Sequence, residues 1–349
     1  MHVSALNGMI NLTETHMAKR RGTQPNQSIR RAAIVSLVML FLLCALVLWE
    51  RCGSYWKRSS ELVTVTTEPV PQEYTVPASR QGTVITIDYP SKDYLTDEEI
   101  TKPAYVYLPY GYDESVQYDV LYLMHGWMMR AQDYLQDSSG IKQLFDHLIE
   151  DGRTRPFIAV CLTFDRDNEA QSYERSVEEL AMFQYELREY AMPYLEEKLS
   201  TYAEKTSIKG LRASRDHRAF GGFSMGAVTT WHQFLFNLDL IRSFIPMSCD
   251  SWIRGSNGGL QKPELTVHSL VTAVHNQRYH LDDYFIYACA GKGDPMFKNI
   301  DTQVQEMKRR QEFCAENMVY AIKEDGLHDM NTVREYFYNA LPRIFPKEG

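Results

Sequence analysis

The stretch Gly222-Phe223-Ser224-Met225-Gly226 decides the fold that we expect for this chain. It follows a short strand-like run, residues 219–223, and opens a helix-like run, residues 227–236. A Gly-x-Ser-x-Gly pentapeptide between a strand and a helix is typical of a nucleophile elbow, a strained turn that exposes the Ser hydroxyl at the top of a sheet. Glycines flank the Ser because the strand and the helix pass too close for a Cβ. The simpler alternative is an ordinary turn with a capping Ser.

Two later strand ends supply an acid and a base in the order that such a site needs. In the α/β-hydrolase fold the catalytic residues follow one another as Ser, acid and His. The apolar run 284–290 leads to Asp294, at the sheet edge where open α/β sheets place their sites. The run 318–322 leads into a loop that carries His328. The sequence therefore predicts Ser224 as nucleophile, His328 as general base and Asp294 as the acid that orients the imidazole.

Other residues compete for two of these roles. Asp250 and Asp301 are alternative acids. The pKa of a His lies near the working pH, so every His has the chemistry to take a Ser proton. His328 is the only one of the ten histidines in a loop after the last expected strand. Those that we weighed against it lie in helix-like or polar stretches, or before the elbow strand: His147, His217, His232, His268, His275 and His280.

Two backbone N–H groups are needed to stabilise the oxyanion that forms when an ester carbonyl is attacked. One is expected from the residue after the nucleophile, Met225, and the other from an earlier strand–helix loop. The run 120–124 leads into His125-Gly126-Trp127, which predicts the N–H of Trp127 as the second donor. We interpret His125 as a structural residue of this turn and not as a base.

Taken together, these stretches resemble the esterase D and feruloyl esterase group, carbohydrate esterase family one. The resemblance spans residues 83–345 and implies hydrolysis of carboxylic esters, often feruloyl or acetyl groups on xylan. The family also contains acyltransferases, so the resemblance does not fix the acyl group or its acceptor. Cys249 stands where we expect Gly in many relatives, at the rim of the site. Besides the pentapeptide, the resemblance rests on residues 105–109, 121–127, 246–252, 291–294 and 326–329.

Apolar strand-like runs alternate with helix-like runs, which predicts a mostly parallel central sheet with helices on both faces, the α/β-hydrolase fold. The first two strands have no helix between them, and we expect them to form an antiparallel edge. The expected strands are 84–87, 104–108, 120–124, 157–162, 219–223, 243–247, 284–290 and 318–322. The expected helices are 141–149, 177–199, 227–236, 304–313 and 333–341.

Aromatic residues near the predicted site are candidates for contact with a sugar or a phenolic acyl group. Trp127 belongs to the oxyanion turn, and Tyr134 follows it in the sequence. Trp252 lies in the glycine-rich stretch 250–259, which we expect to form a mobile loop beside the site. The alternative for each of the three is an ordinary place in the core or at the rim of an aromatic-rich protein.

Charge divides unevenly along the chain and argues against one class of partner. Residues 1–58 hold eight Lys or Arg and two acids, a net charge of +6, and the whole chain carries −8, which leaves −14 for the remainder. Nucleic-acid binding needs a basic face, so the acidic part argues against it. No Cys-x-x-Cys or Cys/His metal spacing occurs in the sequence. The chemistry expected of the site requires no metal and no cofactor.

Residues 32–49 form an uncharged apolar run that just reaches the length of a membrane span. Basic residues precede it, so we expect one transmembrane signal anchor with residues 1–31 in the cytoplasm and the catalytic part outside. A cleaved signal peptide, which would release a secreted protein, is the alternative. Residues 50–80 are predicted to be an extended linker, or else to include an irregular strand at 62–65 that packs on the domain. Residues 81–349 complete the expected esterase domain.

Three functions follow from these patterns. The leading hypothesis is a membrane-anchored, extracytoplasmic serine esterase that acts on an acylated polysaccharide or a small ester. The second is an acyltransferase that uses the same residues to move the acyl group to a sugar or a lipid. The third is a non-catalytic carbohydrate-binding surface protein, against which the complete set of Ser, His and Asp argues, because binding alone does not need all three.

Overall fold

The computed structural model describes residues 34–41, 61–169 and 171–347. Residues 61–347 are built around one nine-stranded sheet with the order β1-β9-β8-β7-β6-β4-β5-β3-β2. Neighbouring strands from β1 across to β5 run parallel, whereas β3 runs antiparallel to both β5 and β2. The expected parallel sheet with an antiparallel edge is confirmed. The strands are β1 (Val63–Thr66), β2 (Thr83–Lys92), β3 (Glu99–Leu108), β4 (Asp119–Met124), β5 (Phe157–Leu162), β6 (Arg218–Phe223), β7 (Ser243–Met247), β8 (Phe285–Gly291) and β9 (Met318–Lys323).

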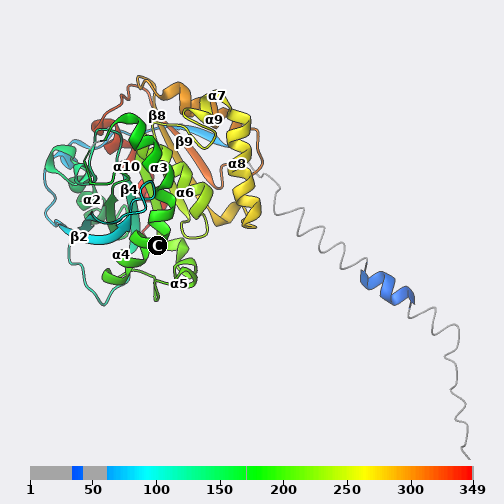
Figure 1. The fold of residues 1–349 in the computed structure, drawn as a ribbon. Helices are drawn as coiled ribbons and strands as arrows, with labels where there is room; N and C mark the ends of the chain where they lie inside the picture. Colours follow the sequence, from blue (N-terminus) through cyan, green and yellow to red (C-terminus); the bar gives the residue numbers. More distant parts are fainter. Residues whose placement is uncertain (1–33, 42–60, 170, 348–349) are drawn as a thin grey trace, which may run out of the picture. The chain divides into compact units, whose positions relative to one another are not determined.

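Helices cover both faces of the sheet, as expected (Figure 1). One face carries a core to which α3, α4, α6, α8 and α9 contribute, with Trp231 fully buried in it. The other face carries a second core, which α2 and α10 build around Phe145 and Phe337. A π-helical turn, Leu187–Ala191, joins α3 to α4. The helices are α2 (Ile141–Glu150), α3 (Tyr173–Glu186), α4 (Met192–Lys198), α5 (Ile208–Ala213), α6 (Met225–Asn237), α7 (Gly258–Gln261), α8 (Pro263–Asn276), α9 (Phe297–Met307) and α10 (Met330–Ile344).

Burial on both faces explains why the central strands are continuous apolar runs in the sequence. Every residue of β4, β5, β6 and β7 is buried. A parallel strand that is covered by helices on each side has no solvent-facing position for polar residues. The carboxyl ends of these strands meet at one edge of the sheet, and the predicted site residues follow those ends.

Several segments differ from the sequence-based expectation. Helices α5 and α7 were not expected, and the expected helix 177–199 is divided into α3 and α4 by the π-helical turn. Residues 63–66 form the edge strand β1, which pairs with β9, so residues 61–80 belong to the domain and the extended linker is wrong for them. Helix α8 was not expected, although Pro263 at its first turn is a common helix start, where the missing N–H costs little. Helix α9 begins at Phe297 and ends at Met307, earlier than the expected 304–313, because it follows directly on the Asp294 loop.

The structure describes only part of the predicted membrane anchor. Residues 34–41 form a helix with exposed apolar side chains. The other residues of the run 32–49, and the whole of the predicted cytoplasmic segment 1–31, lie outside the described residues. Among the helices of the described part of the chain, none has both the length and the apolar character needed to cross a bilayer.

Candidate active site

Ser224 lies at the sharp turn between β6 and α6. Its φ of 58° and ψ of −118° fall outside the regions that L-residues ordinarily occupy. A Cβ on Gly222 would lie 2.4 Å from the carbonyl oxygen of Gly226, and a Cβ on Gly226 would lie 2.0 Å from that of Met124. Ser224 makes no side-chain capping hydrogen bond with α6. These observations favour the nucleophile elbow over an ordinary capping turn.

His328 and Asp294 are hydrogen-bonded to each other at the carboxyl edge of the sheet. Both carboxylate oxygens of Asp294 lie 2.9 Å from Nδ1 of His328. A carboxylate only accepts, so Nδ1 carries the proton and Nε2 is the free acceptor of the ring. The imidazole packs on the ring of Phe223, the residue before Ser224, with centroids 4.4 Å apart. Among the described residues no hydrogen bond joins Ser224 Oγ to His328, and such bonds often tighten only when substrate binds.

The loops that carry the acid and the base hold each other. A Cβ on Gly291, at the end of β8, would lie 2.5 Å from the carbonyl oxygen of Gly326. The N–H of Gly293 donates to that same oxygen at 2.9 Å. Asp329 caps α10 by accepting a hydrogen bond from the N–H of Thr332. The position of His328 is therefore fixed from both sides of its loop.

The two alternative acids serve other purposes. Asp250 is fully buried, and its carboxylate accepts hydrogen bonds from the N–H of Leu260 at 3.0 Å and from the indole N–H of Trp252 at 3.1 Å. Asp301 lies on α9 and accepts from the Gln side chain four residues later. Asp250 therefore ties the stretch 250–259 together.

Cys249, where the resemblance led us to expect Gly, is a buried thiol whose pKa is raised well above its usual value by burial.

The two predicted oxyanion donors flank Ser224. Met225 begins α6, so its N–H has no acceptor within the helix and lies at the positive end of the helix dipole. On the other side, a Cβ on Gly126 would lie only 3.2 Å from Cβ of Ser224. Within the described residues, neither the N–H of Met225 nor that of Trp127 donates a hydrogen bond to the protein. Both groups are thus available to an oxyanion.

His125 has a structural role, as we interpreted it from the sequence. The side chain is fully buried, and both ring nitrogens are hydrogen-bonded, to the Gly126 carbonyl oxygen and to Thr163 Oγ1, each at 2.8 Å. Burial lowers the pKa of His125 to about 4. The imidazole is therefore neutral at physiological pH and has no free nitrogen to act as a base.

Aromatic side chains form one wall beside the site. Trp127 and Tyr173 are exposed, and their rings meet nearly at right angles with centroids 5.4 Å apart. The Tyr173 ring lies 6.2 Å from that of Trp252, which is 9% exposed. The indole N–H of Trp127 donates to the carbonyl oxygen of Gln171 at 3.1 Å. Tyr173 was missed in the sequence, where the only signal was an aromatic residue next to a helix-capping Ser172.

Tyr134 is not a substrate contact. Its side chain is fully buried, and its hydroxyl donates to the carbonyl oxygen of Met124 at 3.0 Å. The same hydroxyl accepts from the N–H of Phe223 at 3.1 Å. The prediction is wrong because the side chain points into the core, where it joins the ends of β4 and β6.

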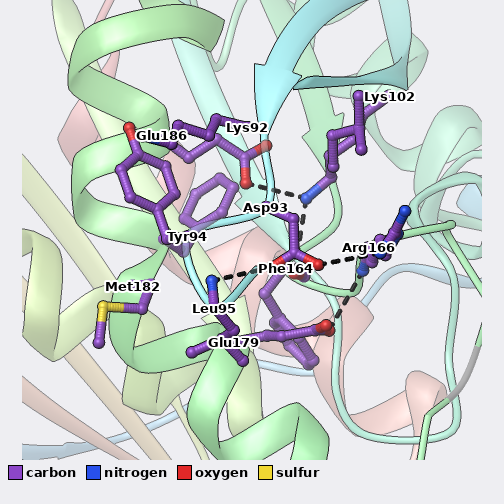
Figure 2. A pocket seen from close by; sticks show the side chains of 12 residues that line it. Lys92, Asp93, Tyr94, Leu95, Lys102, Phe164, Arg166, Glu179, Met182 and Glu186 are labelled. Carbon is purple, nitrogen blue, oxygen red and sulfur yellow. Dashed lines mark hydrogen bonds and ion pairs between the residues drawn. The ribbon is translucent and has the colours of Figure 1, made fainter. Parts of the chain in front are cut away.

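A cavity beside α3 adjoins His125, whose ring centroid lies 4.7 Å from that of the lining residue Phe164 (Figure 2). It contains the buried ion pair of Lys102 and Glu186, whose atoms are 2.9 Å apart. Asp93 in the same cavity accepts hydrogen bonds from the N–H of Leu95 and from the Arg166 side chain. None of its 12 lining residues is a predicted site residue. We therefore assign this cavity no part in the reaction.

With this geometry in place, comparison with known proteins identifies the family. The family described as "Putative esterase" matches residues 98–347. The chain belongs to this esterase family. The resemblance read from the sequence and the expected enzyme class, a serine esterase, are confirmed.

Two curated relatives of this esterase are parts of longer proteins. Endo-1,4-beta-xylanase Y of Acetivibrio thermocellus is 33% identical over 284 residues, which are 79% of this chain and 24% of that protein. Endo-1,4-beta-xylanase/feruloyl esterase of Xylanibacter ruminicola is 32% identical over 133 residues, 36% of this chain and 16% of that protein. The chain thus spans a quarter or less of the length of these relatives.

Solved structures support the same assignment. A mutant of the feruloyl esterase module from Clostridium thermocellum, complexed with sinapinate, has a TM-score of 0.73 and 31% identity, and the match covers 83% of this chain and 96% of that chain. A ferulic acid esterase from Anaeromyces mucronatus has a TM-score of 0.59 and 22% identity, and covers 79% of this chain and 97% of that chain. The second likeness supports the fold alone.

Proposed function

We propose that this esterase hydrolyses feruloyl-type esters of a polysaccharide through an acyl-enzyme on Ser224. The observation that carries the proposal is the pairing of His328 Nδ1 with both oxygens of Asp294 at 2.9 Å, beside a Ser held at φ 58°. A buried acid, an oriented base and a strained Ser are the three parts of a serine-hydrolase triad.

The reaction proceeds in two halves. Ser224 Oγ attacks the ester carbonyl while Nε2 of His328 takes the hydroxyl proton. Asp294 holds the ring in the required tautomer and stabilises the imidazolium. His328 then gives its proton to the sugar oxygen, the carbon–oxygen bond breaks, and the alcohol leaves. Water then attacks the acyl-enzyme carbonyl while His328 takes a proton from it, the bond between the acyl carbon and Ser224 Oγ breaks as His328 gives that proton to Oγ, and the carboxylic acid is released.

The oxyanion of each tetrahedral intermediate is stabilised by the two free backbone N–H groups. Met225 provides one donor from the start of α6, and Trp127 provides the other from the turn after β4. Fixed dipoles of this kind stabilise the transition state without reorganisation at the moment of reaction.

The acyl group that we propose is a hydroxycinnamate. The exposed rings of Trp127 and Tyr173 offer aromatic surface next to the oxyanion turn, and the buried ring of Trp252 lies 6.2 Å from that of Tyr173. An aromatic ring gains from edge-to-face and offset contacts with such a wall. The relative that binds sinapinate adds support, since sinapinate is itself an aromatic acid.

Hydrolysis of a substrate panel tests the proposal. The full chain is assayed with methyl ferulate, p-nitrophenyl acetate and acetylated xylan, and Ser224→Ala serves as the matched control. We expect the highest kcat/KM on methyl ferulate and no turnover by the variant. Transfer of the acyl group to an added alcohol in preference to water would support the acyltransferase instead. Polysaccharide binding without ester cleavage by the wild type would support the non-catalytic protein.

We also propose that residues 32–49 anchor the chain in a membrane, with the catalytic domain on the outer side. The support is the apolar run and the basic residues before it. Fractionation of cells that express the full chain or residues 55–349 tests this. We expect the full chain in the membrane fraction and accessible to external protease, and the shorter chain in the soluble fraction.

A further inference from the structure

A buried chain of hydrogen bonds leads to the peptide that carries one oxyanion donor. His125 follows β4 and Thr163 follows β5, and these neighbouring parallel strands end in register at Met124 and Leu162. His125 Nε2 lies 2.8 Å from Thr163 Oγ1, and Nδ1 lies 2.8 Å from the carbonyl oxygen of Gly126. Both side chains are fully buried, so water does not compete for these bonds.

The direction of each bond follows from the chemistry of the groups. The Gly126 carbonyl only accepts, so Nδ1 of His125 carries the proton and donates. Nε2 is then an acceptor, and the hydroxyl of Thr163 donates to it. The N–H of Asp165 donates to Thr163 Oγ1 at 3.1 Å. The carbonyl oxygen of Asp165 is a second acceptor within reach of the Thr163 hydroxyl, but at 3.5 Å it is farther away than Nε2 of His125 at 2.8 Å, so we direct the hydroxyl proton to the ring. The ring is kept neutral by a pKa that burial lowers to about 4.

The Gly126 carbonyl is held from two sides, by His125 and by the N–H of Met129 at 3.2 Å. A trans peptide is planar, so its N–H points opposite to its C=O. No peptide bond of the described residues is cis. Fixing the Gly126 oxygen therefore fixes the direction of the Trp127 N–H, which lies in the same peptide unit. This unit follows the Cα of Gly126, on which a Cβ would lie 3.2 Å from Cβ of Ser224.

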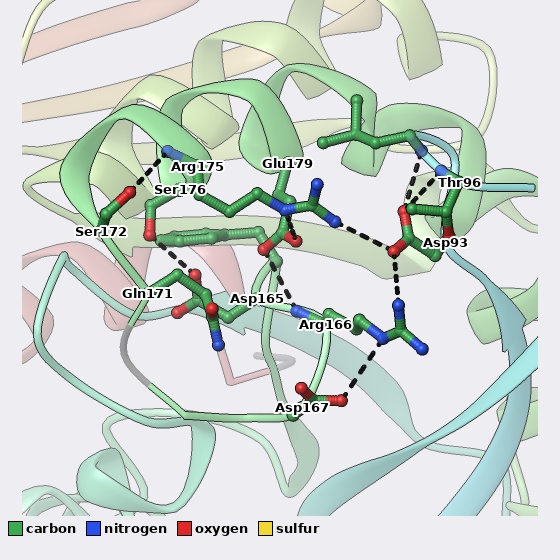
Figure 3. A network of polar contacts seen from close by, with 12 residues as sticks. Asp93, Thr96, Asp165, Arg166, Asp167, Gln171, Ser172, Arg175, Ser176 and Glu179 are labelled. Atoms are coloured by element: carbon green, nitrogen blue, oxygen red, sulfur yellow. Dashed lines mark hydrogen bonds and ion pairs between the residues drawn. The ribbon is translucent and has the colours of Figure 1, made fainter. Parts of the chain in front are cut away.

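The segment that follows Thr163 is bound to helix α3 through Asp165 and Arg166 (Figure 3). Asp165 accepts a hydrogen bond from Ser176 Oγ on α3 at 2.8 Å. The N–H of Arg166 donates to the carboxylate of Glu179 at 3.1 Å, on the same helix. The backbone on which Thr163 depends is thus tied to α3 and has little freedom to shift.

We propose that Thr163 is a positioning residue of the oxyanion hole, acting through His125 and the Gly126 carbonyl on the N–H of Trp127. The inference rests on the proposed esterase function. Without the Thr163 hydroxyl, Nε2 of His125 becomes a buried acceptor with no donor, which costs free energy. A ring that turns to relieve this cost releases the Gly126 carbonyl. The N–H of Trp127 then loses its fixed direction, and its hydrogen bond to the oxyanion is weakened.

The test compares Thr163→Val, which is nearly isosteric but lacks the hydroxyl, with Thr163→Ser, which keeps it. Thr163→Ala serves as a second hydroxyl-free variant. Thr154→Val is the matched control, because Thr154 is equally buried and its Oγ1 has no hydrogen-bond partner in the described structure. For Thr163→Val and Thr163→Ala we expect kcat on methyl ferulate to fall about 10- to 100-fold, below the full cost of deleting an oxyanion donor. We expect KM within about threefold of the wild type, since this donor acts on the transition state rather than the ground state.

A transition-state analogue separates positioning from a general loss of structure. An aryl boronic acid adds to a Ser hydroxyl and places a tetrahedral oxygen in the oxyanion hole, whereas free ferulate does not. We expect Thr163→Val to weaken boronate inhibition in parallel with kcat while ferulate affinity stays unchanged, and Thr163→Ser to recover most of both. Unchanged kcat in folded Thr163→Val and Thr163→Ala, or equal losses in Thr154→Val, would overturn the proposal. A wild type that cleaves no ester would instead overturn the proposed function, independently of Thr163.

Discussion

Replacing Asp294 by Asn alters the protonation of the general base His328, while the side chain at position 294 keeps its size and shape. The carboxylate is fully buried, and both of its oxygens accept from Nδ1 of His328 at 2.9 Å. The Asn oxygen can still accept the N–H of Met296, which lies 2.7 Å from Oδ1, so we expect the loop to keep its conformation. The amide NH₂ then takes the place of Oδ2, 2.9 Å from Nδ1, while the amide oxygen at the Oδ1 position is shared between Nδ1 and the N–H of Met296. The NH₂ repels Nδ1–H but can donate to an unprotonated Nδ1, so the substitution favours the tautomer in which Nε2 carries the proton.

An imidazole with its proton on Nε2 cannot accept the proton of Ser224. We therefore expect kcat on methyl ferulate to fall about 10³- to 10⁴-fold, the scale set by the loss of tautomer control in a serine-hydrolase triad. This corresponds to about 4–5 kcal/mol of transition-state stabilisation. KM is expected to change little, because the Asp294 side chain is fully buried and contacts His328 rather than solvent. The melting temperature is expected to stay within a few degrees of the wild type.

The matched control for this variant is Asp301→Asn, which removes the same charge from α9. Steady-state kinetics and thermal unfolding of the full chain are measured for both. Our reasoning is refuted if folded Asp294→Asn keeps more than about a tenth of the wild-type kcat. It is equally refuted if Asp301→Asn loses as much activity, since that would make Asp301 the acid.

Three further substitutions test the elbow and the buried groups behind it. Gly226→Ala puts a Cβ 2.0 Å from the Met124 carbonyl oxygen, and we expect urea unfolding to show a loss of about 3 kcal/mol. Tyr134→Phe removes the hydroxyl bonded to that oxygen, and we expect a loss of about 1–3 kcal/mol with an unchanged KM for methyl ferulate. Burial lowers the pKa of His125 to about 4 and raises that of Asp165 to about 6. Between pH 4 and 6 the unfolded His binds more protons than the folded one and the unfolded Asp binds fewer, so their effects on stability have opposite signs. In Asp165→Asn only the effect of His125 remains. We therefore expect the free energy of unfolding to rise with pH more steeply than in the wild type, by up to about 1.4 kcal/mol per pH unit.

Each of these expectations has a clear contrary result. If Gly226→Ala were as stable as the wild type, the strand and the helix would be able to move apart at no cost in folding free energy. A KM that rises many-fold in Tyr134→Phe would return Tyr134 to the substrate site. Parallel pH profiles of Asp165→Asn and the wild type would show that Asp165 does not titrate in this window.

The chemistry of the site was predictable from short stretches because each part is a local signal. The Gly-x-Ser-x-Gly turn reports a close backbone approach, and the structure shows that approach at Gly222 and Gly226. Asp294 and His328 were found because each follows the carboxyl end of an apolar strand. Parallel strands bring such ends to one edge, so residues 34 positions apart meet.

Contacts that depend on side-chain direction were not predictable in this way. Tyr134 and Trp127 are close in sequence and both aromatic, yet one is fully buried and the other is exposed. Tyr173 lies 46 positions after Trp127, and only the packing of α3 against the sheet brings the rings within 5.4 Å. Strand β1 is short and carries few apolar residues, so its alternation of apolar and polar residues was too brief to distinguish a strand from a linker.

The sequence by itself determined the fold class, the elbow, the base and a short set of candidate acids, since backbone approach and strand ends leave local patterns. The tertiary structure decided which aromatic residues face the site, which acid pairs with His328, and that Thr163 lies within hydrogen-bond reach of His125. These depend on strand order and register, which place distant segments side by side. Neither property is encoded in the composition or the period of any one stretch.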